Sequence, residues 1–147
     1  YGPLYKVVGE NFDEMVDDSD TDVFLEVYAP WCGHCKELAP TIKKLAKRFK
    51  DVPTVKICDM DGTANEHPLV KDAKGFPAIY FFPAGGKGVR IPWDEEEKRT
   101  VGGFTRFIQA NAKHPFELPK IKSKEEKAAE REAKRKAKEY EEAHEEL

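Results

Sequence analysis

The sequence has no long hydrophobic run and contains little cysteine, methionine or tryptophan. No stretch of its 147 residues approaches the roughly 18 apolar residues that a membrane-spanning helix requires. Its three cysteines are too few for a disulfide framework. The net charge of −3, on a chain that is 36% charged, shows no basic excess and indicates no nucleic-acid partner. The length favours one globular domain with a full core and an appendage.

The sequence starts at Tyr1, without a methionine or a signal-like segment. We therefore expect it to be a mature piece, or a fragment, of a longer protein.

Two of the cysteines stand where a predicted strand passes into a predicted helix. The apolar run at 23–28 is typical of a buried strand, and a helical spacing of apolar residues follows: Leu38, Ile42, Leu45, Ala46 and Phe49. Cys32 and Cys35 thus fall in the first helical turn, where free N–H groups and the helix dipole stabilise a thiolate. We expect Cys32 to be unusually acidic, with a pKa below the usual value of about 8.5. An imidazolium at His34 stabilises the reduced state further and makes the disulfide a stronger oxidant.

The residues around these cysteines resemble the active site of the protein disulfide isomerase family. The motif Trp31-Cys32-Gly33-His34-Cys35-Lys36 is preceded by Tyr-Ala-Pro and followed, after one residue, by Leu-Ala-Pro. The similarity continues at 63–66, 75–77, 81–83 and 99–100 and covers most of residues 1–115. It is strongest to the C-terminal catalytic thioredoxin-like domain of the isomerase.

The resemblance implies an α/β thioredoxin fold over residues 1–115, with a mixed central sheet flanked by helices. It implies an enzyme that forms, reduces and rearranges disulfide bonds in folding secretory proteins, and whose partners are unfolded or misoxidised proteins. Further thioredoxin-like domains are expected N-terminal to the chain. No cofactor, metal, nucleic acid or membrane is implied.

The resemblance also implies the residues of the site. The catalytic set contains both cysteines, the two residues between them, a buried acid and an arginine that approaches the second cysteine: Cys32, Gly33, His34, Cys35, Glu26 and Arg99. The substrate-binding set contains Trp31, Phe76 and Pro77, with a cis bond between Phe76 and Pro77.

Glu26 stands out from the residues alone, because a carboxylate is costly within the otherwise apolar strand 23–28. It is either a satisfied or edge-exposed acid, or a buried base behind Cys35 whose pKa burial raises toward neutrality. The family usually carries a lysine where this chain has Asp59, and Lys56 lies an odd number of residues away, so it should face the other side. Without a cation, the pKa of Glu26 is expected to rise further.

Two other classes of function remain open at this point. Cys32, Cys35, Cys58 and a histidine are candidate zinc ligands, although no second pair at zinc-finger spacing is present. The other alternative is a redox-inactive, chaperone-like module that only binds clients. For Cys58 itself we expect an inert core thiol and not a third redox partner.

The remaining elements follow from local pattern. Strands are expected at 5–8, 54–58, 78–82 and 89–91. Helices are expected at 11–16, with Asn11 as the cap, at 65–73 and after Thr100. Pro40 should kink the helix that starts at Cys32.

Residues 116–147 form a charged tail that we expect to be helical or frayed. From Ser123 onward the composition is dominated by Lys, Glu, Arg and Ala, with opposite charges four residues apart. The final residues, His144-Glu145-Glu146-Leu147, resemble the retrieval signals of the endoplasmic reticulum. Behind a disulfide-exchange domain, they predict residence in the endoplasmic reticulum lumen.

Overall fold

The computed structural model describes residues 3–17, 19–118 and 124–145. The chain forms two compact units, Tyr1–Phe116 and Glu117–Leu147. Within the described ranges, no helix combines the length and the apolar character needed to cross a membrane.

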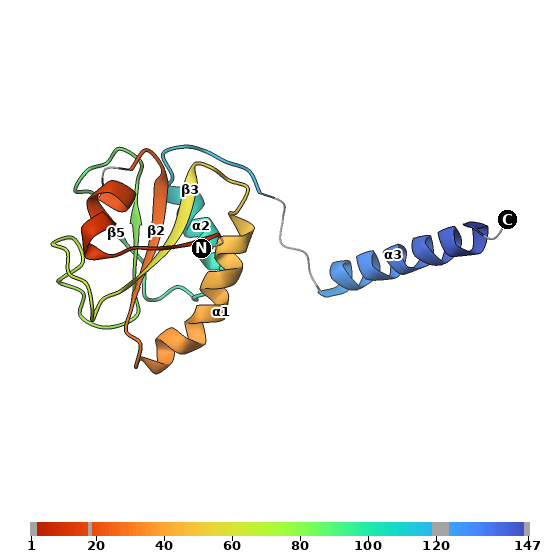
Figure 1. Ribbon diagram of the computed structural model, residues 1–147, viewed down its shortest axis with the longest axis horizontal. Helices are drawn as coiled ribbons and strands as arrows, with labels where there is room; N and C mark the ends of the chain where they lie inside the picture. Colours follow the sequence, from red (N-terminus) through yellow and green to blue (C-terminus); the bar gives the residue numbers. More distant parts are fainter. Residues whose placement is uncertain (1–2, 18, 119–123, 146–147) are drawn as a thin grey trace. The chain divides into compact units, whose positions relative to one another are not determined.

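The first unit is built on a mixed sheet of five strands (Figure 1). The strands are β1 (Leu4–Lys6), β2 (Asp22–Tyr28), β3 (Val55–Asp61), β4 (Ala78–Phe82) and β5 (Ile91–Pro92). Their order is β1-β3-β2-β4-β5, with β1, β3 and β2 parallel to one another and β4 antiparallel to both β2 and β5. The strand that precedes the two cysteines, β2, is therefore central, as the apolar run predicts.

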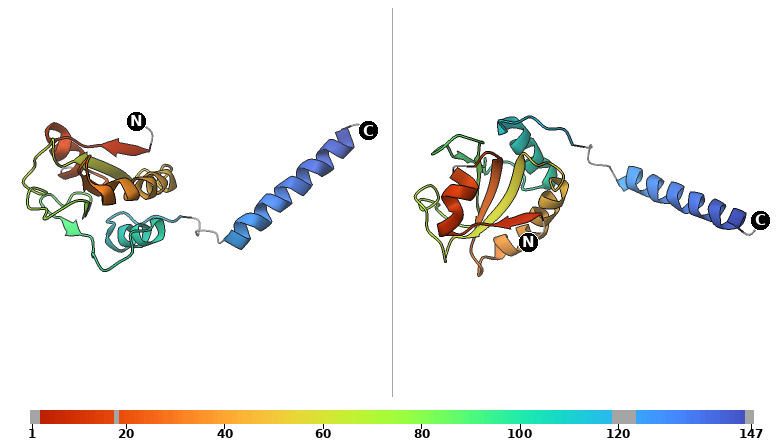
Figure 2. Two further views of the ribbon diagram at one scale, coloured as in Figure 1. Left: turned by 90° about the horizontal axis from the view of Figure 1, so that it is seen from below. Right: turned by 45° about the horizontal axis from the view of Figure 1, so that its top comes forward.

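Helices cover both faces of the sheet. The helical segments of this unit are η1 (Gly9–Asn11), η2 (Asp13–Asp17), α1 (Gly33–Arg48) and α2 (Val101–Asn111). Alternate side chains of β2 belong to opposite faces of the sheet. On one face, Leu25 is part of the core cluster that contains Phe12 and Val16 of the η1–η2 segment. On the other face, Phe24 packs on Phe104 of α2, with ring centroids 5.1 Å apart. Figure 2 shows this unit from two further directions. The expected mixed sheet flanked by helices is confirmed.

Helix α1 begins immediately after Cys32 and contains Pro40. Its buried side chains include Cys35 and the apolar series expected from the spacing, Leu38, Ile42, Leu45 and Ala46. The helix continues through Pro40 and bends along its length (Figure 1), as expected from the lost N–H donor.

Two of the expected helices differ from the structure. Residues 65–73 form turns and not a regular helix, because Pro68 has no N–H and disfavours helical geometry at His67. The predicted helix capped by Asn11 is replaced by η1 and η2, and Asn11 is the last residue of η1. The Asn11 Oδ1 atom accepts a hydrogen bond from the Val8 N–H at 2.8 Å, so this side chain closes the turn that precedes it.

The last strand is shorter than expected and is shifted along the chain. In place of a strand at 89–91, β5 covers Ile91–Pro92. Gly88 has φ +79°, and the Val89 N–H donates to the Gly86 oxygen at 2.8 Å. Because residues 86–89 form this turn, the strand starts only at Ile91.

In the described part of the second unit, residues 124–145 form the helix α3 (Lys124–Glu145). Ion pairs along its surface include Lys134 with Glu130 at 3.7 Å and Arg135 with Glu139 at 2.8 Å. Such pairs each stabilise an exposed helix by only about 0.2–0.5 kcal/mol. The last two residues of the predicted retrieval signal lie outside the described residues.

Candidate active site

Cys32 occupies the N-cap position of α1, where its sulfur faces the start of the helix. The Cys32 Sγ accepts a hydrogen bond from the Cys35 N–H at 3.2 Å, and it lies 3.5 Å from the carbonyl oxygen of Phe76. Cys32 is 7% exposed and Cys35 is 5% exposed, and both are free thiols. A backbone donor at a helix N-terminus stabilises negative charge on the sulfur that it contacts.

Cys35 lies deeper and holds its proton tightly. Burial raises the pKa of its thiol to about 11, and the hydrogen bond with Cys32 acts in the same direction. A thiol in this state is not a nucleophile at neutral pH. Cys35 therefore needs a neighbouring proton acceptor before it can attack a disulfide.

Glu26 is the candidate proton acceptor for Cys35. It lies on the central strand β2 and is 3% exposed, so the edge-exposed alternative is wrong. Burial raises its pKa to about 7, and the nearby carboxylate of Asp59 adds to the rise, whereas Lys6 and Arg99 oppose it. A carboxyl with a pKa near 7 is suited to exchanging protons at neutral pH.

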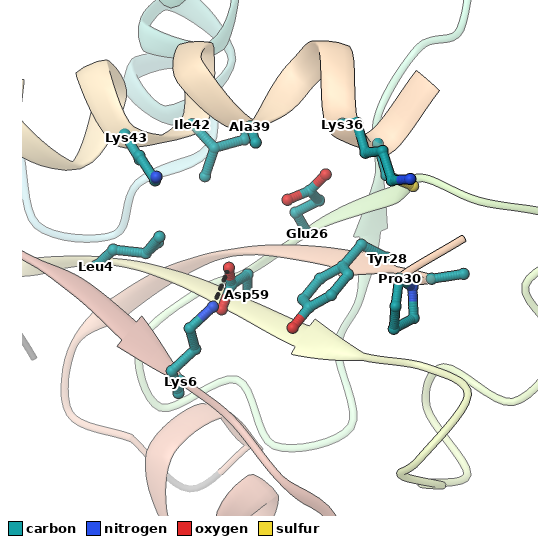
Figure 3. Close-up of a pocket in the computed structure, with 12 residues that line it drawn as sticks. Leu4, Lys6, Glu26, Tyr28, Pro30, Lys36, Ala39, Ile42, Lys43 and Asp59 are labelled. Carbon is teal, nitrogen blue, oxygen red and sulfur yellow. Dashed lines mark hydrogen bonds and ion pairs between the residues drawn. The ribbon is translucent and has the colours of Figure 1, made fainter. Parts of the chain in front are cut away.

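Glu26 and Cys35 line one cavity of about 240 Å³ between the sheet and α1. Figure 3 shows the Glu26 carboxyl directed into the space below α1, with Lys36 and Ile42 above it and Asp59 and Tyr28 below. The Glu26 Oε2 atom is buried and has no hydrogen-bond partner among the described protein groups. The cavity is large enough to admit a few water molecules, which are able to carry a proton between the two groups.

The cation near Glu26 is Lys6, on a strand that was expected from the sequence but was not expected to contribute to the site. Asp59 lies in register with Glu26, as inferred, and Lys56 lies near the ring of Tyr5 on the other face of the sheet, as its odd spacing predicts. The expectation of a site without a cation is wrong, because Lys6 of β1 reaches Asp59 with Nζ and Oδ2 2.8 Å apart. Only the order of the strands, which local pattern does not give, places Lys6 there.

The three residues expected to bind substrate lie beside Cys32. Trp31 is 70% exposed and meets Phe76 edge to face, with ring centroids 5.9 Å apart. The Phe76–Pro77 peptide bond is cis, as the resemblance implies. A groove of about 390 Å³ is lined by Phe76 and Pro77 and also by Trp93 and Arg99.

Arg99 is paired with an acid in this structure. Its Nη2 atom lies 2.7 Å from the Glu95 Oε2, and its side chain is 32% exposed. Its charge reaches Glu26, whose pKa it lowers. The expected approach of Arg99 to Cys35 stays a prediction.

The two residues between the cysteines face outward. The side chain of His34 is 81% exposed, with its Nδ1 atom 3.8 Å from the Glu37 Oε2. A Cβ built on Gly33 meets no other atom within 4 Å. The helix start is therefore open to an approaching peptide at both positions.

Residues 3–110 match the thioredoxin family. The chain belongs to the thioredoxin family. It is 52% identical over 119 residues to protein disulfide isomerase-like 1-4 of Arabidopsis thaliana, which covers 81% of this chain and 20% of that protein. It is 46% identical over 111 residues to protein disulfide-isomerase A3 of Gallus gallus, covering 76% and 22%. The solved first thioredoxin domain of mouse protein disulfide-isomerase A4 superposes with a TM-score of 0.64 at 31% identity, covering 82% of this chain and 84% of that one.

This thioredoxin-family chain spans about one fifth of the length of the curated relatives that it matches. The residues that match the family, 3–110, contain the sheet, α1 and all but the last residue of α2, and thus the residues of the candidate site.

Cys58, the third cysteine of this thioredoxin-family domain, is separated from the other two. It is fully buried in the core cluster that contains Leu25 and Val27, on the face of the sheet opposite Glu26. Burial raises the pKa of its thiol to about 12. Within the described ranges, no group of three His, Cys, Asp or Glu side chains is arranged to hold a metal ion. The placement of Cys58 argues against the zinc alternative.

Proposed function

We propose that this domain is a thiol–disulfide oxidoreductase that forms, reduces and rearranges disulfide bonds in folding secretory proteins. The observation that carries the proposal is the pair of thiols on one helical turn, one at the N-cap of α1 and one buried beside an acid of raised pKa. The relatives named protein disulfide isomerase support it.

In the reductive direction, the Cys32 thiolate attacks a disulfide of the client. A Cys32–client bond forms, the client disulfide breaks, and one client sulfur leaves as a thiolate. Cys35 then gives its proton to Glu26 and attacks the Cys32 sulfur. The Cys32–Cys35 disulfide forms, and the second client sulfur leaves as a thiolate.

The same groups serve oxidation and isomerisation. In oxidation the steps run in reverse, so a client thiolate attacks the Cys32–Cys35 disulfide and the client is oxidised as the two cysteines are reduced. In isomerisation another client thiolate attacks the client sulfur of the mixed disulfide. The Cys32 thiolate then leaves, and no net oxidation has occurred.

The client segment that carries the disulfide is proposed to lie over Trp31, Phe76 and Pro77. Trp31 offers an exposed aromatic face next to the Cys32 sulfur, and the groove beside Phe76 runs toward Trp93 and Arg99. A peptide in this position places its disulfide at the mouth of the site, next to Cys32, which is 7% exposed.

The setting of the domain is also part of the proposal. The relatives are about five times as long as the matched segment, which supports further thioredoxin-like domains in the parent protein. From the resemblance of the motifs, we propose that this domain is the C-terminal catalytic domain of that protein. Residues 144–147 support residence in the endoplasmic reticulum lumen.

The proposal is tested by reactivation of scrambled ribonuclease in a glutathione buffer. We expect the full chain to accelerate the return of ribonuclease activity well above the buffer alone, because Cys32 provides a positioned thiolate. The matched control is the same chain after reduction and alkylation of its reactive thiols. Equal acceleration by the two preparations would favour a module that binds clients without redox turnover, and would overturn the oxidoreductase.

Replacing His34 by Pro is expected to lower the reduction potential by tens of millivolts. An imidazolium at this position stabilises the Cys32 thiolate, whereas proline carries no charge. Thioredoxins have a reduction potential of about −270 mV, and protein disulfide isomerase has one of about −180 mV. Proline is tolerated in the first turn of a helix, so α1 should be retained. The potential is measured by equilibration with glutathione, with His114→Gln as an exposed histidine control. An unchanged potential in the proline variant would contradict this role.

A further inference from the structure

Three ionisable side chains form a row across three neighbouring strands. Lys6 on β1 is in register with Asp59 on β3, and Asp59 is in register with Glu26 on β2. Residues in register on adjacent parallel strands point to the same face, with the strands about 4.8 Å apart. The row starts at the edge of the sheet, where the Lys6 side chain is 62% exposed, and ends at Glu26, which is 3% exposed.

The two acids of the row line one cavity (Figure 3). Cys35 lines the same cavity. Lys6 Nζ lies 2.8 Å from Asp59 Oδ2. The other Asp59 oxygen, Oδ1, and the Glu26 Oε2 are both buried without a hydrogen-bond partner among the described protein groups. Because no donor among the described residues binds these two oxygens, the charge on one carboxyl acts strongly on the other in this low-dielectric setting.

We propose that Asp59 and Lys6 are positioning residues that set the protonation of Glu26, and thereby the rate at which Cys35 resolves mixed disulfides. A carboxylate at Asp59 disfavours ionisation of Glu26, and the ammonium of Lys6 favours it. The link to Cys35 rests on the proposed function, whereas the coupling inside the row does not. Glu26 is thus one member of a three-residue acid–base unit.

Other ionisable groups also face Glu26 from the elements packed around it. They are Tyr28 on β2, Cys35, Lys36 and Lys43 on α1, and Arg99 just before α2. Lys36 and Lys43 are exposed, and Arg99 is engaged by Glu95. Asp59 and Lys6 differ from these groups because they lie in strand register with Glu26, which fixes their backbone positions relative to it.

The proposal predicts opposite effects for the two neighbours. Asp59→Asn removes a negative charge beside Glu26, so the midpoint of Glu26 titration falls by about one pH unit. Lys6→Met removes the positive charge, so the midpoint rises. A purely structural role for both residues would give no reason for opposite signs.

The experiment is a carbon-13 NMR titration of the Glu26 carboxyl in the reduced 147-residue chain, with the signal assigned by its loss in Glu26→Gln. The rate of mixed-disulfide resolution by Cys35 is measured over the same pH range in single turnover. Lys6→Arg preserves the ion pair with Asp59 and should keep the wild-type midpoint. Lys56→Met removes a lysine from the other face of β3 and is the matched control for loss of charge.

Midpoints that move in opposite directions for Asp59→Asn and Lys6→Met, with Lys6→Arg and Lys56→Met unchanged, support the row. Unchanged midpoints, or shifts of the same sign, overturn it. The resolving rate should follow the carboxyl titration in each variant. If the midpoints move but the rate profile does not, the coupling stands, and the role of Glu26 in the proposed function is the part that fails.

Discussion

Replacing Cys35 by Ser is expected to convert the domain from a catalyst into a trap for its clients. Cys32 keeps its place at the N-cap of α1 and still attacks a client disulfide, but the hydroxyl of the serine does not displace the client sulfur. An intramolecular thiol acts at a far higher effective concentration than millimolar glutathione. We therefore expect the escape of the client to slow by about 100-fold or more.

The trapped species is measured on a non-reducing gel, as a covalent adduct between the chain and ribonuclease that has been reduced and then partly reoxidised. Serine is close in size to cysteine, so the buried position at the start of α1 should be retained. Cys58→Ala is the matched control, because it removes a thiol from the opposite face of the sheet. No accumulation of adduct in Cys35→Ser, or equal accumulation in Cys58→Ala, would contradict the division of labour between the two cysteines.

The elements next to the cysteines could be predicted from the sequence because their signals are local. An apolar run followed by apolar residues at helical spacing predicts β2 and α1, and the structure places both as expected. Burial of Glu26 follows from the same run, since a strand covered on both faces leaves a carboxylate no route to solvent. The resemblance of the motif to a known family added the positions of Phe76 and Pro77, which lie far away along the chain.

Lys6 could not be predicted as part of the site, because its position depends on the order of the strands. The local sequence of residues 4–6 does not determine that β1 pairs with β3 and not with β2. Once that pairing is known, the register with Asp59 follows directly. An ion pair that depends on two strand pairings is thus beyond reasoning from local pattern, even where the acid has been identified.

The predicted helix at 65–73 failed for a different reason. Its first residues are held by contacts with distant segments: Asn65 Oδ1 accepts from the Gly9 N–H at 3.0 Å, and His67 Nε2 lies 2.7 Å from Asp13 Oδ1. His67 also stacks on Phe12, with ring centroids 3.8 Å apart. These contacts anchor the segment as a series of turns, and Pro68 removes the local alternative.

Replacing Glu26 by Gln is expected to stabilise the domain at alkaline pH and to leave its stability little changed at low pH. Glu26 has a pKa of about 7 in the folded chain, against 4.5 for an unperturbed carboxyl, so the folded state holds this proton more tightly than the unfolded state. Below the lower value both states are protonated and the acid has no net effect. As the pH rises from 4.5 through 7, the unfolded state ionises first, and the wild-type chain loses stability relative to the variant, by about 3 kcal/mol at most.

The free energy of unfolding is measured by urea denaturation of the reduced chain at several pH values between 4 and 8.5. The difference between Glu26→Gln and wild type should grow with pH and level off above the folded pKa. Glu14→Gln is the control, because Glu14 is exposed on η2 and its removal should give a difference that does not vary in this way. A difference that stays constant across the range would show that the folded and unfolded states bind the Glu26 proton equally. Glu26 would then have no raised pKa with which to act as the base for Cys35.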